Sequence, residues 1–539
     1  MIEEGLRAKS TASTSYVDLV RNADDGDVHD EDSFRTFCCS NIAQEEKRGQ
    51  GIMIVMRIYK LFILAVSYYC DMKVTYLCEG KTMTELQNTS NTTETETMVT
   101  GEREHQSLII SKSIPGALTN HSDVIPRVVI VGAGFGGLRA ARALRNAPVH
   151  VSVIDRQNHH LFQPLLYWVA TAGLSPADIC SPIRSILRKQ KNTEVFMEEV
   201  TGIDFQEQRV LMRDRSVPYD YLVLATGAHV NYFGHPEWEH YAPALKSIVD
   251  ATSIRRKILQ SFEAAEIETD PEKVKALLTF ALVGAGPTGV EMAGAIAELA
   301  HKALVSDFRH IDTRLARIIL IEAAPRILGA FPESLAQKTK QKLVSMGVEV
   351  RTEAPVEEVD EHGVVIAGER INASTIIWSA GVSASSAGKW LGADVDRAGR
   401  VKVASDLSVP GHPNVFVIGD TASIMQEGKA LPGVAQVAMQ GGRYVASVII
   451  GRVEGKATNK PFSYRDKGNL ATVGRSFAIV DINNIRLTGF FAWLIWLAVH
   501  IYFLVGFRNR LVAIFQWAWT YFTFDRGARL ITFENDRDP

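Results

Sequence analysis

A glycine-rich pattern, Gly-x-Gly-x-x-Gly, constrains the fold most, because it occurs twice between an apolar strand and a helical stretch. The first copy follows the strand Arg127–Val131 and runs from Gly132 to Gly137. In such a turn the first glycine allows a tight bend, the second lets a pyrophosphate approach the backbone, and the third allows close helix–strand packing. The next strand, His150–Ile154, leads to Asp155, whose carboxylate can accept hydrogen bonds from ribose hydroxyls.

The same pattern recurs in the same setting farther along the chain. It follows the strand Thr279–Val283, runs from Gly284 to Gly289, and precedes a strand, Arg317–Ile321, that leads to Glu322. This acid lies farther from the last glycine than the usual ~20 residues, so an inserted piece of helix or loop is expected before the strand. One such pattern is a weak signal. Two copies in matching contexts predict two dinucleotide sites, most economically for FAD and NAD(P)H.

Short strands and helices alternate from Pro126 onward. Together with the two glycine-rich patterns, this alternation predicts an α/β fold with two Rossmann-like dinucleotide-binding domains. The apolar C-terminus adds an expected membrane-anchoring segment. An earlier apolar run, Ile52–Tyr69, contains Arg57 and Lys60 near its middle, which makes a membrane span unfavourable there. The expected divisions are a poorly ordered N-terminal extension (1–123), three core segments (124–245, 246–380 and 381–486) and the membrane-associated segment (487–539). The family resemblance set out below implies that the first and third core segments form the FAD-binding domain and that the second is the NAD(H)-binding domain.

Charge and cysteine content exclude several classes of function. The net charge of -3 gives no sign of a polyanionic partner, so nucleic acid is not expected. Beyond residue 124 the only cysteine is Cys180, so this part has neither a disulfide framework nor zinc-type ligand spacing, and no metal is expected. Cys180 lies between Pro176 and Pro182 and is interpreted as a packed or half-exposed residue rather than a nucleophile.

Four further segments carry a resemblance to a known family. Tyr219–Gly227 resembles the strand and turn where the chain leaves an FAD domain, and Asn414–Asp420 resembles the second FAD motif. His159–Tyr167 is similar to a stretch beside the flavin, and Ala435–Gln440 is similar to a quinone-site motif. From about residue 125 to 535, the chain therefore resembles the glutathione-reductase-like flavoproteins. Within them it looks most like the type II NADH dehydrogenases, which are non-pumping NADH:quinone oxidoreductases.

The resemblance implies roles for particular residues. The expected FAD-binding residues are Gly132, Gly134, Gly136, Gly137, Asp155, Gln163, Thr226, Gly227, Gly419 and Asp420. The expected NAD-binding residues are Gly284, Gly286, Gly289, Glu291, Glu322 and Gly381, and the expected quinone-binding residues are Ala435, Gln436 and Gln440. Glu291 is also the catalytic candidate, as a nicotinamide-side contact or a proton link. Two alternatives stay open: Glu291 as a first-turn carboxylate favoured by the helix dipole, and the two glutamines as a solvated helix face.

The C-terminus carries an apolar stretch, Phe490–Phe507, in which His500 is the only titratable residue apart from one tyrosine. Arg486 precedes the stretch, and Arg508 and Arg510 follow it. By length it can barely cross a bilayer core of ~30 Å. The sequence alone favours a short transmembrane helix over a buried core helix, whereas the resemblance implies a monotopic anchor in the membrane interface. The chain is therefore expected to be membrane-bound, with the depth of insertion left open.

The resemblance implies that hydride passes from NADH, the co-substrate, to FAD, and that two electrons then pass to a membrane quinone without proton pumping. Two alternatives are an NADH-binding flavoprotein redox sensor and a reductase of a protein electron acceptor. A disulfide reductase is excluded because it needs a cysteine pair beside the flavin. The expected partners are quinone and the lipid bilayer, with a homodimer left open. The expected place is the respiratory chain, at the cytoplasmic face of a bacterial inner membrane.

Overall fold

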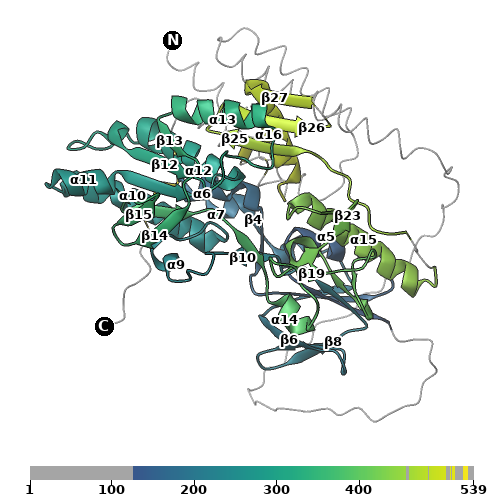
Figure 1. Ribbon diagram of the computed structural model, residues 1–539. Helices are drawn as coiled ribbons and strands as arrows, with labels where there is room; N and C mark the ends of the chain where they lie inside the picture. Colours follow the sequence, from purple (N-terminus) through teal and green to yellow (C-terminus); the bar gives the residue numbers. More distant parts are fainter. Residues whose placement is uncertain are drawn as a thin grey trace, which may run out of the picture. The chain divides into compact units, whose positions relative to one another are not determined.

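The computed structural model describes residues 125–456, 460–483, 485–505, 510, 513–515 and 526–531, all within the compact unit Glu94–Pro539. The expected N-terminal extension, with its apolar run, lies outside the described residues, as does most of the aromatic stretch after Arg510. Figure 1 shows the elements that position the site.

The first fingerprint belongs to a six-stranded sheet with the order β20-β21-β9-β1-β2-β5. Neighbouring strands are parallel except for the edge pair of β20 and β21. The central strands are almost entirely buried, as is usual for parallel strands that helices cover. The bounds are β1 Arg127–Val131, β2 His150–Asp155, β5 Thr193–Met197, β9 Tyr221–Leu224, β20 Ser408–Val409 and β21 His412–Val417. Segments on both sides of the second fingerprint thus build one sheet.

Two helices beside this sheet make close contact, α5 (Phe135–Ala143) and α15 (Ala435–Val453), and Figure 1 shows them side by side. The contact needs glycine, since a Cβ at Gly442 would lie 2.3 Å from the carbonyl oxygen of Gly136. Smaller elements complete this part of the chain: β3 His159–Leu161, η1 Gln163–Leu165, α6 Leu166–Ala170, α7 Pro176–Ile179, β4 Cys180–Pro182, α8 Ile183–Leu187, β6 Val200–Asp204, β7 Arg209–Met212, β8 Ser216–Pro218, α14 Ala387–Leu391, β19 Val401–Lys402, η4 Gly419–Thr421, β22 Ala422–Ser423, β23 Met425–Gln426 and β24 Lys429–Ala430.

The second fingerprint belongs to a parallel four-stranded sheet with the order β13-β12-β11-β17. A pair of antiparallel strands, β10 and β18, joins the chain where it enters and leaves this domain. The bounds are β10 Ala228–Val230, α9 Trp238–Tyr241, α10 Ile248–Ile267, α11 Pro271–Leu277, β11 Thr279–Val283, α12 Pro287–Glu298, β12 Arg317–Ile321, α13 Glu333–Ser345, β13 Val348–Arg351, β14 Val356–Asp360, β15 Gly363–Ile366, β16 Glu369–Asn372, β17 Thr375–Trp378 and β18 Val382–Ala384. The prediction of two Rossmann-like dinucleotide-binding domains is confirmed.

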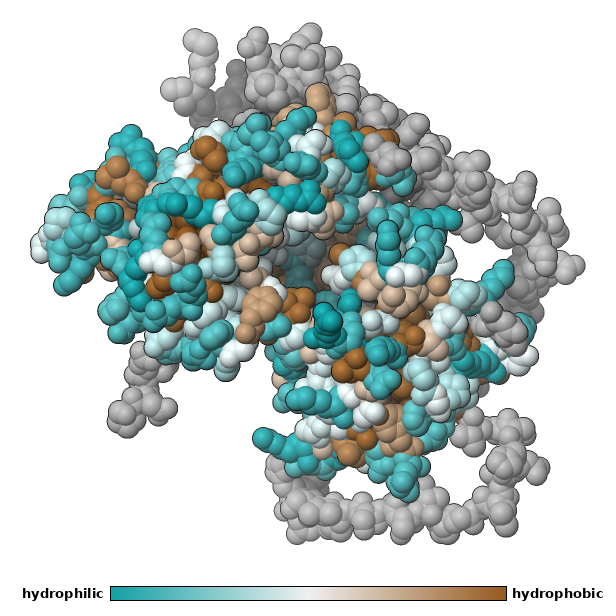
Figure 2. Space-filling model, in the orientation of Figure 1, coloured by the Kyte–Doolittle hydropathy of each residue, from teal (hydrophilic) through white to brown (hydrophobic). Residues whose placement is uncertain are grey.

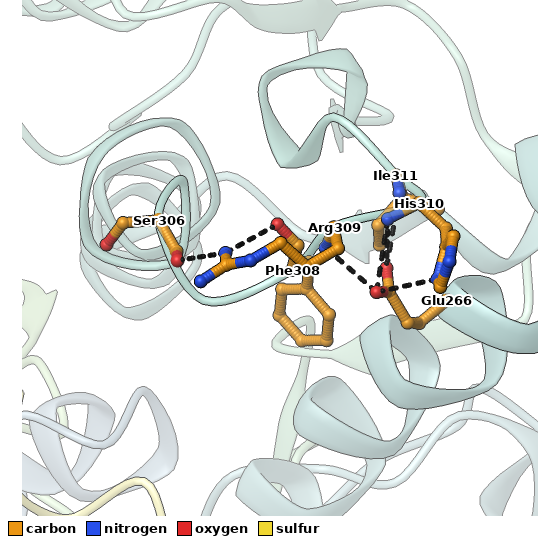
Figure 3. Close-up of polar contacts among 6 residues, drawn as sticks. All are labelled: Glu266, Ser306, Phe308, Arg309, His310 and Ile311. Atoms are coloured by element: carbon orange, nitrogen blue, oxygen red, sulfur yellow. Dashed lines mark hydrogen bonds and ion pairs between the residues drawn. The ribbon is translucent and has the colours of Figure 1, made fainter.

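The insertion expected before β12 is present. Helix α12 continues into a π-helix, η2 (Leu299–Ala303), and a loop with the 3-10 turn η3 (Thr313–Leu315) follows. Figure 3 shows how Glu266 of α10 holds this loop: its carboxylate accepts hydrogen bonds from the backbone N–H groups of residues 309–311. The imidazole of His310 lies 3.1 Å from the same carboxylate. The insertion is therefore fixed to the domain and does not displace Glu322 from the end of β12.

A third, antiparallel sheet follows α15 and consists of β25 (Asn469–Val473), β26 (Phe477–Ile482) and β27 (Ile485–Gly489). β25 packs against α12, and α13 contacts all three strands. The chain then enters α16 (Phe490–Phe503), which packs against β26 and buries Trp493 and Trp496. The expected boundary between residues 486 and 487 falls inside β27, so the C-terminal stretch is continuous with this sheet.

The expected short transmembrane helix is wrong for the part of the chain that the structure describes. Helix α16 ends at Phe503, where Leu504 turns to an extended conformation. A helix of 14 residues is about 21 Å long, well short of the ~30 Å apolar core of a bilayer. Among the described residues, no helix has the length and apolar character that a membrane crossing requires. One side of α16 is instead used for packing against protein.

The described residues near the C-terminus form a buried ionic contact with the second domain. Arg526 is 4 % exposed, and its guanidinium donates to the carbonyl oxygen of Thr171 at 2.6 Å. It also lies 3.5 Å from the carboxylate of Glu298, at the end of α12. The other oxygen of Glu298 accepts the backbone N–H of Arg475 at 2.9 Å. Arg526 therefore joins the C-terminal residues to α12 and to the end of α6.

We expect Arg526→Met to lower the free energy of unfolding by about 3–5 kcal/mol, because Glu298 would stay buried without its cationic partner. The double variant Arg526→Met/Glu298→Gln removes both charges and should recover part of that loss. Thermal and denaturant unfolding of the purified, FAD-loaded proteins measures the difference. Equal stability of wild type and Arg526→Met would contradict the assigned role of the contact.

Candidate active site

A cavity of about 750 Å³ adjoins both fingerprints. Its walls come from the β1–α5 turn, the start of α12, the start of α15 and one residue of α16, and Figure 2 shows a hollow in the surface where polar and apolar side chains meet. The expected site residues that line it are Gly132, Gly134, Gly136, Asp155, Gln163, Thr226, Gly227, Glu291, Gly381, Gly419, Asp420 and Ala435. The expected site residues outside its lining are Gly137, Gly284, Gly286, Gly289, Glu322, Gln436 and Gln440.

The glycines of the two fingerprints have matching geometry. The first glycines, Gly132 and Gly284, have φ values of +96° and +98°, which residues with a side chain rarely adopt. A Cβ at the third glycine would lie 1.8 Å from the carbonyl oxygen of Gly132 in one copy and 1.9 Å from that of Gly284 in the other. The second glycine of each copy has no atom within 4 Å of the Cβ position. Each turn thus keeps open space beside the backbone at the helix start, where a phosphate can approach.

The acids that follow the two fingerprints also match. Asp155 accepts the N–H of Ala133 at 2.6 Å, and Glu322 accepts the N–H of Ala285 at 2.7 Å. The second oxygen of each carboxylate accepts another N–H two residues after the acid, at 2.8 Å and 2.9 Å. Each carboxylate therefore fixes its glycine turn to the neighbouring strand. A carboxylate has about four acceptor positions, so both can still accept hydrogen bonds from a ribose.

The residues along the first domain fit FAD. Gly134 leaves open space at the start of α5, where a pyrophosphate would lie. The lining continues to Asp155 at the end of β2 and to Asp420, which follows β21 at the same carboxyl edge of the sheet. The turns of this wall are tied together, since Thr226 Oγ1 lies 3.2 Å from Thr421 Oγ1, which donates to the carbonyl oxygen of Gly227 at 3.1 Å. A long cavity with a phosphate-binding turn and a ribose-binding acid is what a bound dinucleotide requires.

Glu291 reaches this cavity from the first turns of α12. Burial raises the pKa of its carboxyl to about 8, and the hydrogen bond from the backbone N–H of Thr472 at 3.4 Å opposes that shift only weakly. Its neighbour Tyr167 is buried as well, and burial raises the pKa of that phenol well above its usual value. At neutral pH both groups carry their protons, so Glu291 can donate a hydrogen bond or a proton inside the cavity.

The two glutamines of α15 have different surroundings. Gln440 pairs with the backbone of Arg465 in both directions: its Nε2 donates to the carbonyl oxygen at 2.9 Å and its Oε1 accepts the N–H at 3.0 Å. Gln436 is half-buried one turn earlier. Ala435 and Ala438 of the same helix line the cavity. The motif therefore reaches the cavity wall through its alanines, and Gln440 holds the segment that precedes β25.

Sequence reasoning missed several residues of the cavity wall. Trp378 ends β17, Leu470 belongs to β25, and His500 belongs to α16. Trp378 and Leu470 occupy strands whose side chains carry no motif. His500 is an interruption in an otherwise apolar stretch, and that interruption was a signal for a polar environment on one side of the helix. Cys180 is half-buried, as expected for a packed or half-exposed residue, and burial raises the pKa of its thiol to about 12.

Comparison with known proteins agrees with this geometry. The model of the family described as pyridine nucleotide-disulphide oxidoreductase matches residues 126–442, and that of the NDH2 C-terminal domain matches residues 467–526. The chain is 47% identical over 421 residues to the type II NADH:quinone oxidoreductase Ndh of Mycobacterium tuberculosis, covering 75% of this chain and 90% of the relative. It is 46% identical over 423 residues to NdhA of the same organism, covering 75% and 89%. The chain belongs to the type II NADH:quinone oxidoreductases.

Solved structures share the fold. The structure of NDH2 from Plasmodium falciparum in complex with NADH has a TM-score of 0.69 at 22% identity, covering 76% of this chain and all of that one (100%). A sulfide:quinone oxidoreductase from Aquifex aeolicus has a TM-score of 0.59 at 20% identity, covering 74% and 95%. The two-domain fold is thus common to enzymes of different chemistry, and the site residues decide the function.

The raised pKa of Glu291 predicts a pH-dependent stability. The carboxyl of Glu291 has a pKa of 4.5 in the unfolded chain and of about 8 in the folded chain. Between these two pH values the unfolded chain releases the proton while the folded chain retains it, so the stability of the wild type falls as pH rises through that range. Glu291→Gln removes this contribution. The melting temperature of Glu291→Gln minus that of wild type should therefore be higher at pH 8 than at pH 5, by about 2–4 °C. A difference between the two proteins that stays constant with pH would contradict the buried, protonated carboxyl.

Proposed function

We propose that this chain is a membrane-associated NADH:quinone oxidoreductase that uses FAD. The observation that carries the proposal is that one cavity is shared by the turn suited to FAD, the first residues of α12 and His500 of α16. NADH on the second domain can then meet one end of a flavin, and a lipid-soluble acceptor can enter beside α16. The relatives from M. tuberculosis, both named type II NADH:quinone oxidoreductases, support the same assignment.

FAD, when bound, accepts hydride from NADH and gives two electrons to the quinone. The protein supplies orientation and the surrounding dielectric. Gly381 and Trp378 belong to the cavity wall beside the second domain. A Cβ at Gly381 would lie 2.6 Å from the ring of the exposed Phe233. A side chain at Gly381 would therefore narrow the nicotinamide end. Glu291 stays protonated at neutral pH and is the group of this wall that can give a proton to the reaction.

The proposed membrane contact uses the outward side of the C-terminal elements. Several aromatic side chains of these elements are exposed to solvent. Aromatic residues favour the headgroup level of a bilayer. The exposed side chains are Phe490, Phe491, Tyr502 and Phe515, with exposed fractions of 39%, 74%, 43% and 71%. Helix α16 packs on β26 and exposes Phe490, Phe491 and Tyr502. This arrangement suits a monotopic, interfacial association, which brings the quinone to the cavity without passage through water.

The deciding experiment is NADH oxidation by the detergent-purified protein with and without a short-chain quinone. Rapid turnover only in the presence of quinone is expected. A redox sensor would reduce its flavin with NADH and reoxidise slowly with quinone, and a reductase of a protein acceptor would need that protein for turnover. Either result would contradict the proposed activity.

NADH should be preferred over NADPH. Glu322 directly follows β12, and a carboxylate in that place accepts a ribose 2′-hydroxyl and repels a 2′-phosphate. The nearby Arg326 could pair with a phosphate, but its guanidinium donates to the carbonyl oxygen of Gly329 at 2.9 Å. The measurement is kcat/KM for both nucleotides, with Arg326→Ala as a control that should leave NADH oxidation unchanged. A higher kcat/KM for NADPH would overturn the assignment.

Replacing Gln436 and Gln440 together with Ala should slow flavin reoxidation by quinone more than flavin reduction by NADH, because both lie on α15, whose Ala435 and Ala438 line the cavity. The loss should be on the order of 1–3 kcal/mol in activation free energy if an amide bonds a desolvated quinone carbonyl. The single variants separate two roles. Gln436→Ala tests contact with the quinone, and Gln440→Ala tests the hydrogen bonds with Arg465. Stopped-flow measurement of both half-reactions decides, and equal slowing of the two would mean that the glutamines only support the flavin site.

A further inference from the structure

Helix α16 reaches the cavity through one residue, His500. The imidazole stacks on Trp496 with ring centroids 4.2 Å apart and meets the edge of Phe162 at 6.1 Å. Phe162 in turn contacts Phe135, which belongs to the first fingerprint, at 6.0 Å. An aromatic wall thus runs from the phosphate-binding turn to α16, and His500 is the polar group at its end.

The hydrogen bonds of His500 determine which nitrogen carries the proton. Nδ1 lies 2.6 Å from the carbonyl oxygen of Trp496, and a carbonyl oxygen can only accept, so Nδ1 carries the hydrogen. Burial lowers the pKa of His500 to about 4, so the ring is neutral at physiological pH. Nε2 is then a lone-pair acceptor, and none of the described residues bonds to it.

An acceptor at this place distinguishes the two redox forms of a quinone. The carbonyl oxygens of a quinone only accept hydrogen bonds, so they gain nothing from Nε2. The hydroxyl groups of the hydroquinone donate, and each can pair with such a nitrogen. Glu291, which faces the same cavity, has the opposite property, because its protonated carboxyl can donate to a quinone carbonyl.

We propose that His500 belongs to the quinone subsite and binds the reduced product, accepting a hydrogen bond from a hydroquinone hydroxyl at Nε2. The inference rests on the proposed NADH:quinone oxidoreductase activity and adds a residue to its acceptor end. By linkage, a site that binds hydroquinone more tightly than quinone makes reduction of the bound quinone more favourable. The same preference slows release of the product.

The test is equilibrium binding of duroquinone and of durohydroquinone, each to the oxidised, FAD-loaded enzyme in detergent without oxygen. His500→Phe keeps the ring and removes the acceptor. We expect durohydroquinone affinity to fall roughly threefold to tenfold, the worth of one neutral hydrogen bond, with duroquinone affinity changed less than twofold. A matched pair controls for packing: the amide of His500→Asn overlies Nδ1 and should behave like His500→Phe, whereas the amide oxygen of His500→Gln can reach the position of Nε2 and should restore binding.

Three results would overturn the inference: equal weakening of both ligands, unchanged durohydroquinone affinity in His500→Phe, or equal behaviour of the Asn and Gln variants. Flavin absorbance and melting temperature show whether each variant is intact, and if His500→Phe loses FAD the Asn and Gln pair decides alone. The proposed function is tested separately by turnover of wild type with NADH and duroquinone. Turnover without the binding difference refutes only the role of His500, and a wild type that does not reduce duroquinone refutes the function.

Discussion

The bond from a strand-terminal carboxylate to the N–H of the neighbouring glycine turn is the interaction on which both nucleotide sites depend. Asp155 and Glu322 each use one oxygen for the turn and the other for the backbone beyond the strand. A buried or half-buried N–H without a partner is costly, so the carboxylate stabilises the turn by accepting a hydrogen bond from it. The turn itself requires glycine at its first position because of the positive φ there. The open space at the second glycine is a consequence of that turn. The backbone geometry of the turn therefore also creates the space for a phosphate, and this holds in both copies.

Two titratable groups of the cavity, Glu291 and His500, are neutral near pH 7. Burial raises the pKa of Glu291 and lowers that of His500, so one side chain is a donor and the other an acceptor near pH 7. Charged groups would bind water and disfavour an apolar quinone ring, whereas neutral donors and acceptors can pair with its oxygens at little desolvation cost. Trp378, Leu470, Phe135 and the alanines of α15 supply the apolar remainder of the wall. Such a site suits a neutral quinone, whose oxygens can form hydrogen bonds with neutral side chains.

The sequence predicted the two sheets and both turns because fingerprint spacing follows from backbone sterics, which act locally. It also predicted the insertion before β12 from the displaced position of Glu322. It did not predict the packing of the C-terminal stretch. An apolar run such as Phe490–Phe503 suits lipid and a protein surface equally, and the burial of Trp496 against β26 is a tertiary contact. The pairing of Gln440 with Arg465 was hidden for the same reason, since helical spacing does not reveal which loop returns to a helix.

Helix α12 connects the active-site cavity to the residues near the C-terminus. Its first turns carry Glu291 at the cavity, and its last residue, Glu298, meets Arg526 from the C-terminal residues. The sheet β25–β27 packs on the same helix and continues into α16, which places His500 in the cavity wall. Removing the chain after Arg486 would therefore cut β27, open the cavity at His500 and leave Glu298 buried without a cation. The C-terminal stretch cannot be a separable anchor, because the residues that would face the membrane and the residues that close the active site belong to the same packed unit.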